Sequence, residues 1–205
     1  MISEEYGNGR TAVEIAARAI FGGADIVQMR EKNKSVQELL DLGEDILALC
    51  RKSGAAFIVN DDPTLAEKIG ADGVHLGQED ARQFPVERAR GIIGPDKIIG
   101  LSTHSLDQLR KANEEDVDYV AFGPIFPTKT KAYHIGVGDI KEVMGIAKKP
   151  VFFIGGINLI NIKEVLTRGA HNIALIRGVT EANDIEIRTR QFKEKLVKQK
   201  GGRKR

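Results

Sequence analysis

A short pattern recurs along the chain and constrains its fold more than any other feature. Glycine and a small polar turn are followed at once by an apolar run, as in "GGADIVQMR" from Gly22, "GADGVHLGQ" from Gly70 and "GAHNIALIRG" from Gly169; "EDVDYVAFG" from Glu115 has the same texture. Glycine commonly ends a helix, and a continuous apolar run is typical of a buried strand. Four helix-to-strand connections of one kind predict a repeating α/β fold.

Three more apolar runs lie between these copies: "AAFIVND" (55–61), "KIIGLST" (97–103) and "PVFFIGG" (150–156). All three are nearly continuous rather than alternating, which is typical of parallel strands buried on both faces. Stretches with helical periodicity fill the gaps, among them "VQELLDLGEDILALCRK" and "LINIKEVLTRG". Strand and helix therefore alternate, which predicts a parallel sheet covered by helices.

The repeat yields seven strands and implies an eighth. Counting back from Gly23, past the helical "RTAVEIAARAIF", puts that strand at the chain start, where only "MIS" precedes polar residues. We therefore expect a (βα)8 TIM barrel whose first strand is truncated; a doubly wound sheet is the alternative, which the fourfold regularity disfavours. An open seam would leave strand edges unpaired, so this chain should be less stable than one extended upstream.

The composition is that of one globular domain. The 205 residues are 41% hydrophobic and 29% charged, which allows a sizeable core. No apolar run approaches the roughly 18 residues of a membrane span, and no secretory leader is evident. Cys50 is the only cysteine and lies on a helical apolar stripe, which predicts a reduced, buried thiol in a cytoplasmic protein.

The net charge of +2 is unevenly distributed, because residues 193–205 hold seven Lys or Arg and one Glu. That segment carries +6, which leaves −4 for the rest of the chain. We expect one catalytic domain over residues 1–192 and a basic, flexible tail over 193–205 that could touch nucleic acid. A body without a basic stripe, in a chain without tryptophan, argues against a nucleic-acid binder. We expect no membrane partner, and a homo-oligomer stays open.

In such a barrel the chemistry lies where the strands end. After the first complete strand, Gln28, Arg30 and Lys32 follow at i, i+2 and i+4, so all three point to one side of an extended segment. The later strand ends carry further candidates, namely Asn60, Asp61 and Asp62, then His75, Gln78, Glu79 and Asp80, then Ser102, Thr128 to Lys131, Gly155, Gly156, Ile176 and Arg177. Polar groups from several strands thus converge on one mouth.

Several of these candidates have structural alternatives. Asp62 precedes Pro63 and suits the cap of the following helix, and the same alternative exists for Asp61. Three further alternatives stay open, namely an ion-pair layer formed by Gln28, Arg30 and Lys32, a tight turn at Gly155 and Gly156, and a packed, hydrogen-bonded strand position for His75.

The residue types indicate anion chemistry. Two carboxylates at adjacent strand ends, Asp61 and Asp80, with oxygen-only neighbours suit Mg²⁺, and the lack of a Cys/His cluster argues against zinc. Cations facing these carboxylates indicate a polyanion bridged by the metal, such as a diphosphate. Gly155 and Gly156, with the last strand end, stand where barrels often bind a single phosphate. Two anion sites imply two phosphorylated substrates.

At these residues the sequence resembles the thiamine phosphate synthase family. The matching stretches are "GGADIVQMREK", "VNDD", "ADGVHLGQED", "GLSTHS", "YVAFGPIFPTKTK" and "PVFFIGGI", which stand in family order and cover most of residues 7–185. The resemblance implies an Mg-dependent transferase that joins 4-amino-5-hydroxymethyl-2-methylpyrimidine diphosphate to 4-methyl-5-(2-phosphoethyl)thiazole. It also implies that diphosphate leaves first, giving a pyrimidine-stabilised carbocation that the thiazole nitrogen captures.

The resemblance assigns roles position by position. Asp61 and Asp80 would ligate Mg²⁺. The pyrimidine diphosphate would be held by Gln28, Arg30, Lys32, Asn60, Ser102 and Lys131, of which Arg30, Ser102 and Lys131 are the catalytic candidates. The thiazole phosphate would be held by Thr128, Thr130 and Gly156, with Ile176 at the last strand end.

Two departures from the family stand out. The opening strand is reduced to Ile2 and Ser3. Arg177 stands where family members usually have a small residue. It either adds a bidentate contact to the thiazole phosphate, or it turns out to solvent or pairs with Glu181.

Other functions are weighed against this one. A thiazole tautomerase of the same fold would not need the full diphosphate apparatus, and Asp61, Asp80 and Lys131 are all present here. A non-catalytic protein that binds thiamine precursors would be favoured by loss of these residues or of Arg30. An isomerase of another kind would need a positioned acid/base pair, which the sequence does not offer clearly.

Overall fold

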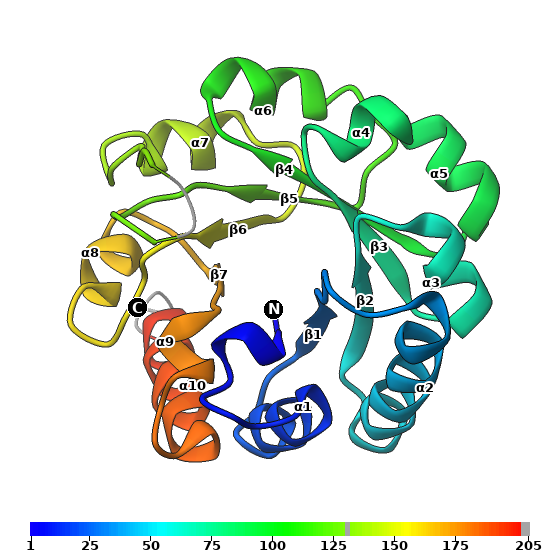
Figure 1. The fold of residues 1–205 in the computed structure, drawn as a ribbon. Helices are drawn as coiled ribbons and strands as arrows, with labels where there is room; N and C mark the ends of the chain where they lie inside the picture. The colour runs from blue at the N-terminus through cyan, green and yellow to red at the C-terminus, as the bar shows by residue number, and fades with distance from the viewer. Residues whose placement is uncertain (130–131, 202–205) are drawn as a thin grey trace.

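The computed structural model describes residues 1–129 and 132–201, and within them a curled, parallel sheet. Each strand pairs in parallel with its sequence neighbours, in the order β1 to β7 (Figure 1). The strands are β1 (Ile26–Met29), β2 (Ala56–Asn60), β3 (Gly73–Leu76), β4 (Ile98–Thr103), β5 (Tyr119–Phe122), β6 (Val151–Ile154) and β7 (Asn172–Ala174). The seven strands and the α/β class predicted from the sequence are confirmed.

Helices line the outside of the curled sheet (Figure 1). They are α1 (Ala12–Phe21), α2 (Val36–Ser53), α3 (Pro63–Ile69), α4 (Asp80–Gln83), α5 (Val86–Ile93), α6 (Leu106–Ala112), α7 (Ile140–Ile146), α8 (Ile162–Thr167), α9 (Arg177–Thr180) and α10 (Ile185–Gly201), with a 3-10 turn, η1, at Glu4–Tyr6. None of the helices described is long and apolar enough to cross a membrane.

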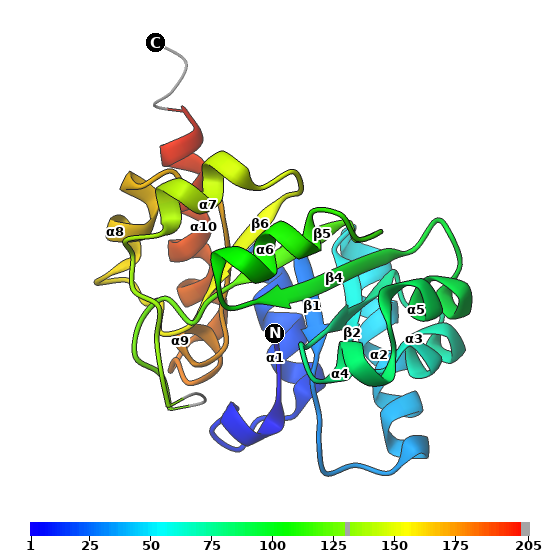
Figure 2. The same cartoon turned by 90° about the horizontal axis from the view of Figure 1, so that it is seen from above.

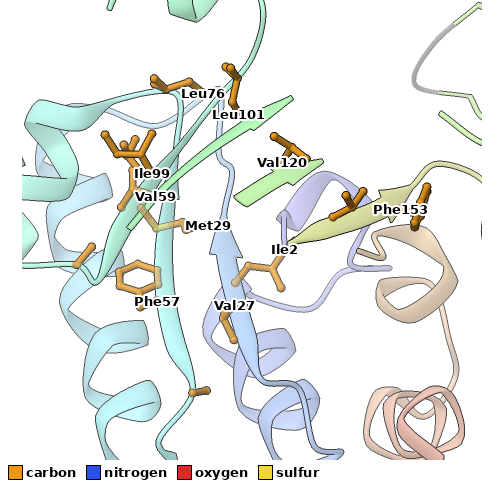
Figure 3. Packing of buried hydrophobic residues seen from close by; sticks show 14 of the residues in the cluster. Ile2, Val27, Met29, Phe57, Val59, Leu76, Ile99, Leu101, Val120 and Phe153 are labelled. Atoms are coloured by element: carbon orange, nitrogen blue, oxygen red, sulfur yellow. The ribbon is translucent and has the colours of Figure 1, made fainter. Parts of the chain in front are cut away.

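The core fills the space between the sheet and these helices. Phe57 and Val59 of β2 are almost fully buried, as are Ile99 of β4 and Phe153 of β6 (Figure 3). Side chains alternate along a strand, so these positions leave Asn60 and its neighbours in register for the inner face of the sheet. Cys50 of α2 is buried as predicted, and burial raises the pKa of its thiol to about 11.

Two of the recurring turns also tie strands together. Gly70 ends α3 in the left-handed conformation, at φ 73°. Asp72 then accepts the backbone N–H of Phe57 at 2.7 Å, and Asp118 accepts that of Ile99 at 2.7 Å. Each aspartate therefore stands directly before one strand and binds the start of the strand next to it.

Asp25 stands in the same place before β1, but on the open side of the sheet. Its carboxylate pairs with Lys193 of α10 instead of a strand. Among the described residues, Ile2 is what bridges to this edge: its N–H donates to Gln28 O at 2.8 Å, and its carbonyl accepts from Arg30 N–H at 3.1 Å. Where the sequence predicts a first strand, the described residues form a single bridge, between Ile2 and Met29.

The first residue completes the link across the seam between β1 and β7, where Figure 1 shows the N-terminus. The Met1 amino group donates to Leu175 O at 3.0 Å, and burial lowers its pKa from 8.0 to about 6. Burial disfavours the charged ammonium because the charge loses its water. Met1 also lines a cavity that adjoins the seam, together with Ala19, Ile26, Ile173, Phe192 and Leu196.

The predicted boundary between a domain (1–192) and a basic tail (193–205) falls inside α10. Figure 2 shows the end of this helix projecting beyond α7 and α8. Lys193, the first residue of the proposed tail, is engaged with Asp25. The division itself stays a prediction.

An apolar strand of about six residues, added ahead of Met1, should raise the melting temperature by about 5–10 °C. It would replace a buried ammonium by an amide, pair the open edges and bury two or three apolar side chains, each worth about 1.5–3 kcal/mol. Thermal melts would compare it with a Gly/Ser extension of equal length. Equal midpoints for the two would contradict the expectation.

Candidate active site

A cavity of about 590 Å³ opens at the carboxyl ends of the strands. It is where a parallel sheet of this kind gathers the polar residues that follow its strands. The residues that line it and to which the resemblance assigns a role are Gln28, Arg30, Asn60, Asp61, Ser102, Thr128 and Ile176. The structure therefore brings together residues separated by almost 150 positions in the sequence.

The first strand end contributes an amide and a cation. Gln28 donates from Nε2 to Asn60 Oδ1 at 3.0 Å, which fixes both amides across β1 and β2. Arg30 is half-buried at the cavity, whereas Lys32 is exposed beyond the strand and outside the cavity lining. Within residues 1–129 and 132–201 neither Arg30 nor Lys32 makes an ion pair, so the alternative of an ion-pair layer is not seen there.

The two aspartates that follow β2 have different roles. Asp62 caps α3, because its Oδ1 accepts Leu65 N–H at 2.9 Å and Pro63 follows it at the first helical position. Asp61 is not the cap. It lines the cavity with a left-handed backbone, φ 70°, which is unfavourable for a residue with a Cβ. Its N–H donates to His75 O at 2.7 Å, which ties this conformation to β3.

The residues after β3 continue the rim. Gln78 and Glu79 line the cavity, and the Gln78 amide donates to Ser102 O. Asp80 is the first residue of α4, and its side chain lies outside what the structure describes. Among the described side chains, no group of three or more His, Cys, Asp or Glu could hold a metal. The oxygen donors present fit Mg²⁺, which commonly takes one or two carboxylates and completes its shell with water and phosphate.

Three side chains form a chain of hydrogen bonds on the inner face of the sheet. His75 is 7% exposed; its Nδ1 lies 2.9 Å from Tyr119 Oη and its Nε2 lies 2.9 Å from Ser102 Oγ. His75 is thus the packed, hydrogen-bonded strand residue of the structural alternative. Its contact with a predicted catalytic residue, Ser102, was not foreseen.

The glycine pair after β6 makes a tight turn against the loop after β5. Gly155 and Gly156 have φ values of 98° and 65°. A Cβ on Gly156 would lie 2.6 Å from Pro127 O and 2.7 Å from Phe126 Cβ, so no side chain fits there. Gly155 lines the cavity and Gly156 does not. The alternative of a tight turn at Gly155 and Gly156 is therefore confirmed. A phosphate contact by Gly156 stays a prediction. Contacts by Thr130 and Lys131 also stay predictions, because both residues lie outside the described residues.

Arg177 begins α9, directly after Ile176. Its Nε lies 3.3 Å from Glu181 Oε1, and its guanidinium lies 4.2 Å from the centre of the Tyr6 ring. It lines a separate surface hollow rather than the large cavity. The described contacts are those of the alternative in which Arg177 pairs with Glu181, and a contact to the thiazole phosphate stays a prediction.

Among the cavity-lining residues to which the sequence analysis assigned no role are His104, Tyr119 and Tyr133. His104 Nδ1 lies 2.6 Å from Gly123 O at the rim. Tyr119 starts β5, and the alternation of side chains along a strand, with Val120 and Phe122 in the core, could have placed it inside.

The sheet, the outer helices and the cavity define the class: an α/β protein of the TIM-barrel type, with its candidate site at the carboxyl ends of the strands. The family model described as thiamine monophosphate synthase matches residues 1–179. The chain belongs to this family.

Individual proteins of this family are similar to the chain in sequence and in structure. A thiamine-phosphate synthase from Persephonella marina is 42% identical over 192 residues, which are 93% of this chain and 90% of that protein. One from Moorella thermoacetica is 37% identical over 204 residues, 98% of this chain and 96% of that protein. A solved structure of thiamine phosphate pyrophosphorylase from Pyrococcus furiosus matches with a TM-score of 0.88 at 35% identity, covering 97% of this chain and 94% of that one.

Replacing each of the neighbouring aspartates should separate stability from site chemistry. Asp62→Ala removes a helix cap worth about 1 kcal/mol, so the melting temperature should fall by about 2–4 °C. Asp61→Gly relieves a left-handed backbone strain of about 1 kcal/mol, but glycine also raises the conformational entropy of the unfolded chain by a similar free energy. The melting temperature should therefore stay within about 2 °C of wild type or rise. Thermal melts check both. A larger loss for Asp61→Gly than for Asp62→Ala would contradict this division.

Proposed function

We propose that this chain is a thiamine phosphate synthase, a transferase that condenses 4-amino-5-hydroxymethyl-2-methylpyrimidine diphosphate with 4-methyl-5-(2-phosphoethyl)thiazole. One observation carries the proposal: in a chain of this family, Gln28, Arg30, Asn60, Asp61 and Ser102, from three strands, line one cavity. Its partners are then small phosphorylated substrates, and a cytoplasmic location is part of the same proposal.

The proposed reaction makes modest demands on acid/base chemistry. The bond between the pyrimidine methylene carbon and the diphosphate oxygen breaks, the diphosphate leaves with the electron pair, and the thiazole nitrogen attacks the resulting cation. Arg30, Ser102 and Lys131 would neutralise or donate to the departing oxygens, where charge builds up. Gln28 and Asn60, already hydrogen-bonded to each other at 3.0 Å, would orient the pyrimidine side.

Mg²⁺ would be held by Asp61 and Asp80, and it would supply charge for the leaving diphosphate when bound. The Asp61 carboxylate suits this role because the backbone places it at the cavity, while Asp62 serves the helix. Thr128 at the cavity, with Thr130 and Gly156, would hold the thiazole phosphate, with Ile176 beside it. Lys32, exposed beyond β1, would close on the diphosphate from outside.

We also propose that the sheet is a (βα)8 barrel with its remaining strand position in the seam between β1 and β7. Two observations support it: Ile2 bridges to β1, and Asp25 repeats the strand-binding position of Asp72 and Asp118 without a strand to bind.

The decisive experiment is an assay of the purified chain with both substrates and Mg²⁺, following thiamine phosphate. We expect product, loss of activity with a chelator, and a decrease of about 100-fold for Asp61→Ala, because a metal contributes several kcal/mol. Circular dichroism establishes that the variant is folded. No product from a folded wild-type chain would contradict the proposal, and proton exchange in a thiazole substrate alone would favour the tautomerase.

Arg177→Ser tests the two interpretations of that residue. A rise in KM for the thiazole phosphate would indicate a phosphate contact. Because the guanidinium is engaged by Glu181 and Tyr6 outside the cavity lining, we expect an unchanged KM and a small loss of stability. Steady-state kinetics with the thiazole phosphate varied decide between them.

A further inference from the structure

We infer that Tyr119 and His75 are positioning residues that hold the Ser102 hydroxyl as a hydrogen-bond donor directed into the cavity. This deepens the proposed function, and its kinetic consequence rests on that function. The starting point is geometric: Tyr119 Oη, the two ring nitrogens of His75 and Ser102 Oγ form a chain with two contacts of 2.9 Å.

The sheet register builds this chain. His75 of β3 pairs with Gly100 of β4, and Gly100 pairs with Tyr119 of β5, so the two rings flank a residue without a side chain. A Cβ on Gly100 would overlap both Tyr119 and His75 Nδ1. Glycine is needed here for space, since its φ is not in the left-handed range. The two rings stack across it, with centroids 5.5 Å apart and an interplanar angle of 26°.

The far side of Tyr119 is packed as well. Phe152 of β6 meets the Tyr119 ring edge to face, with centroids 5.1 Å apart. The phenol ring is therefore packed between an imidazole and a phenyl ring, which fixes the position of its oxygen. Ser102, two residues beyond Gly100 on β4, lies closer to the mouth of the cavity.

The direction of the hydrogen bonds follows from the donors available. Within the described residues, the Tyr119 hydroxyl forms its hydrogen bond with His75 Nδ1. If His75 Nδ1 carried a proton, the phenol O–H would have no protein acceptor among the described residues, which is costly for a largely buried hydroxyl. Tyr119 therefore donates to Nδ1, the single proton of the neutral ring is on Nε2, and Nε2–H donates to Ser102 Oγ.

This arrangement leaves one hydrogen unassigned, that of the Ser102 hydroxyl. Because Ser102 Oγ already accepts from His75, its own O–H is free to donate to an oxygen in the cavity. Burial raises the pKa of Tyr119, which keeps the phenol a neutral donor across the working pH range. The Gln78 amide holds the Ser102 carbonyl from the other side, so backbone and side chain are both fixed. A donor oriented in advance suits an oxygen that gains charge as a diphosphate departs.

The histidine tautomer tests the inference without any assay of activity. The protein has four histidines, so a long-range ¹H–¹⁵N spectrum of histidine-labelled protein, with His75→Gln to assign the signal, can identify the His75 ring. We expect the Nε2–H tautomer in wild type and loss of that single state in Tyr119→Phe. A neutral ring protonated on Nδ1, or a doubly protonated ring at neutral pH, would overturn the inference.

A double-mutant cycle tests the kinetic consequence. Tyr119→Phe should lower kcat by about fivefold to tenfold, the worth of one hydrogen bond. In a Ser102→Ala background the same change should cause no further loss, because Tyr119 acts through Ser102. A residue that only supports packing would slow both backgrounds by the same factor, and that result would overturn the inference.

Tyr6→Phe is the matched control, since it removes a phenol oxygen outside the cavity lining and keeps the ring beside Arg177. It should leave kcat unchanged. The two proposals fail separately. A folded wild-type chain that makes no thiamine phosphate contradicts the proposed function, while the tautomer of His75 still decides whether Ser102 is held as a donor.

Discussion

The parallel pairing of each strand with its sequence neighbours is the constraint on which the site depends. It brings the carboxyl ends of the strands to one rim, so residues that follow a strand meet there whatever their separation in the chain. The register adds a second level of order. Asn60, His75, Gly100 and Tyr119 lie at consecutive paired positions across β2 to β5. Asp61 directly follows this row after β2, and Ser102 lies two residues beyond it on β4.

The opposite end of the sheet is held by the aspartates that stand before the strands. Asp72 and Asp118 each bind the backbone of a neighbouring strand and so fix the register that the site requires. Asp25 repeats the position but pairs with Lys193, and Ile2 bridges to Met29 at the carboxyl end of β1. In the proposed barrel the remaining strand position lies in this seam, where apolar residues such as Ile173 and Phe192 line the cavity.

Much of this was predictable from the sequence, for identifiable reasons. The strands are buried on both faces and therefore read as continuous apolar runs, and the polar residues after them could be placed at one mouth. The sequence favoured Asp62, directly before Pro63, as the helix cap and kept Asp61 as an alternative; the hydrogen bond from Leu65 N–H to Asp62 confirms the first. The sequence could not show the contact of His75 with Tyr119 and Ser102, because that depends on the register of three strands and on the space left by Gly100.

The neighbouring aspartates show how stability and chemistry are divided within two residues. Asp62 satisfies the N-terminus of α3, so the chain can turn sharply at Asp61 without leaving the helix uncapped. The turn puts Asp61 in a conformation that costs free energy for any residue with a Cβ, and a hydrogen bond to His75 O holds it there. His75 is in turn fixed by Tyr119. The proposed metal ligand and the proposed serine donor are therefore both positioned through one histidine, by its backbone carbonyl and its ring respectively.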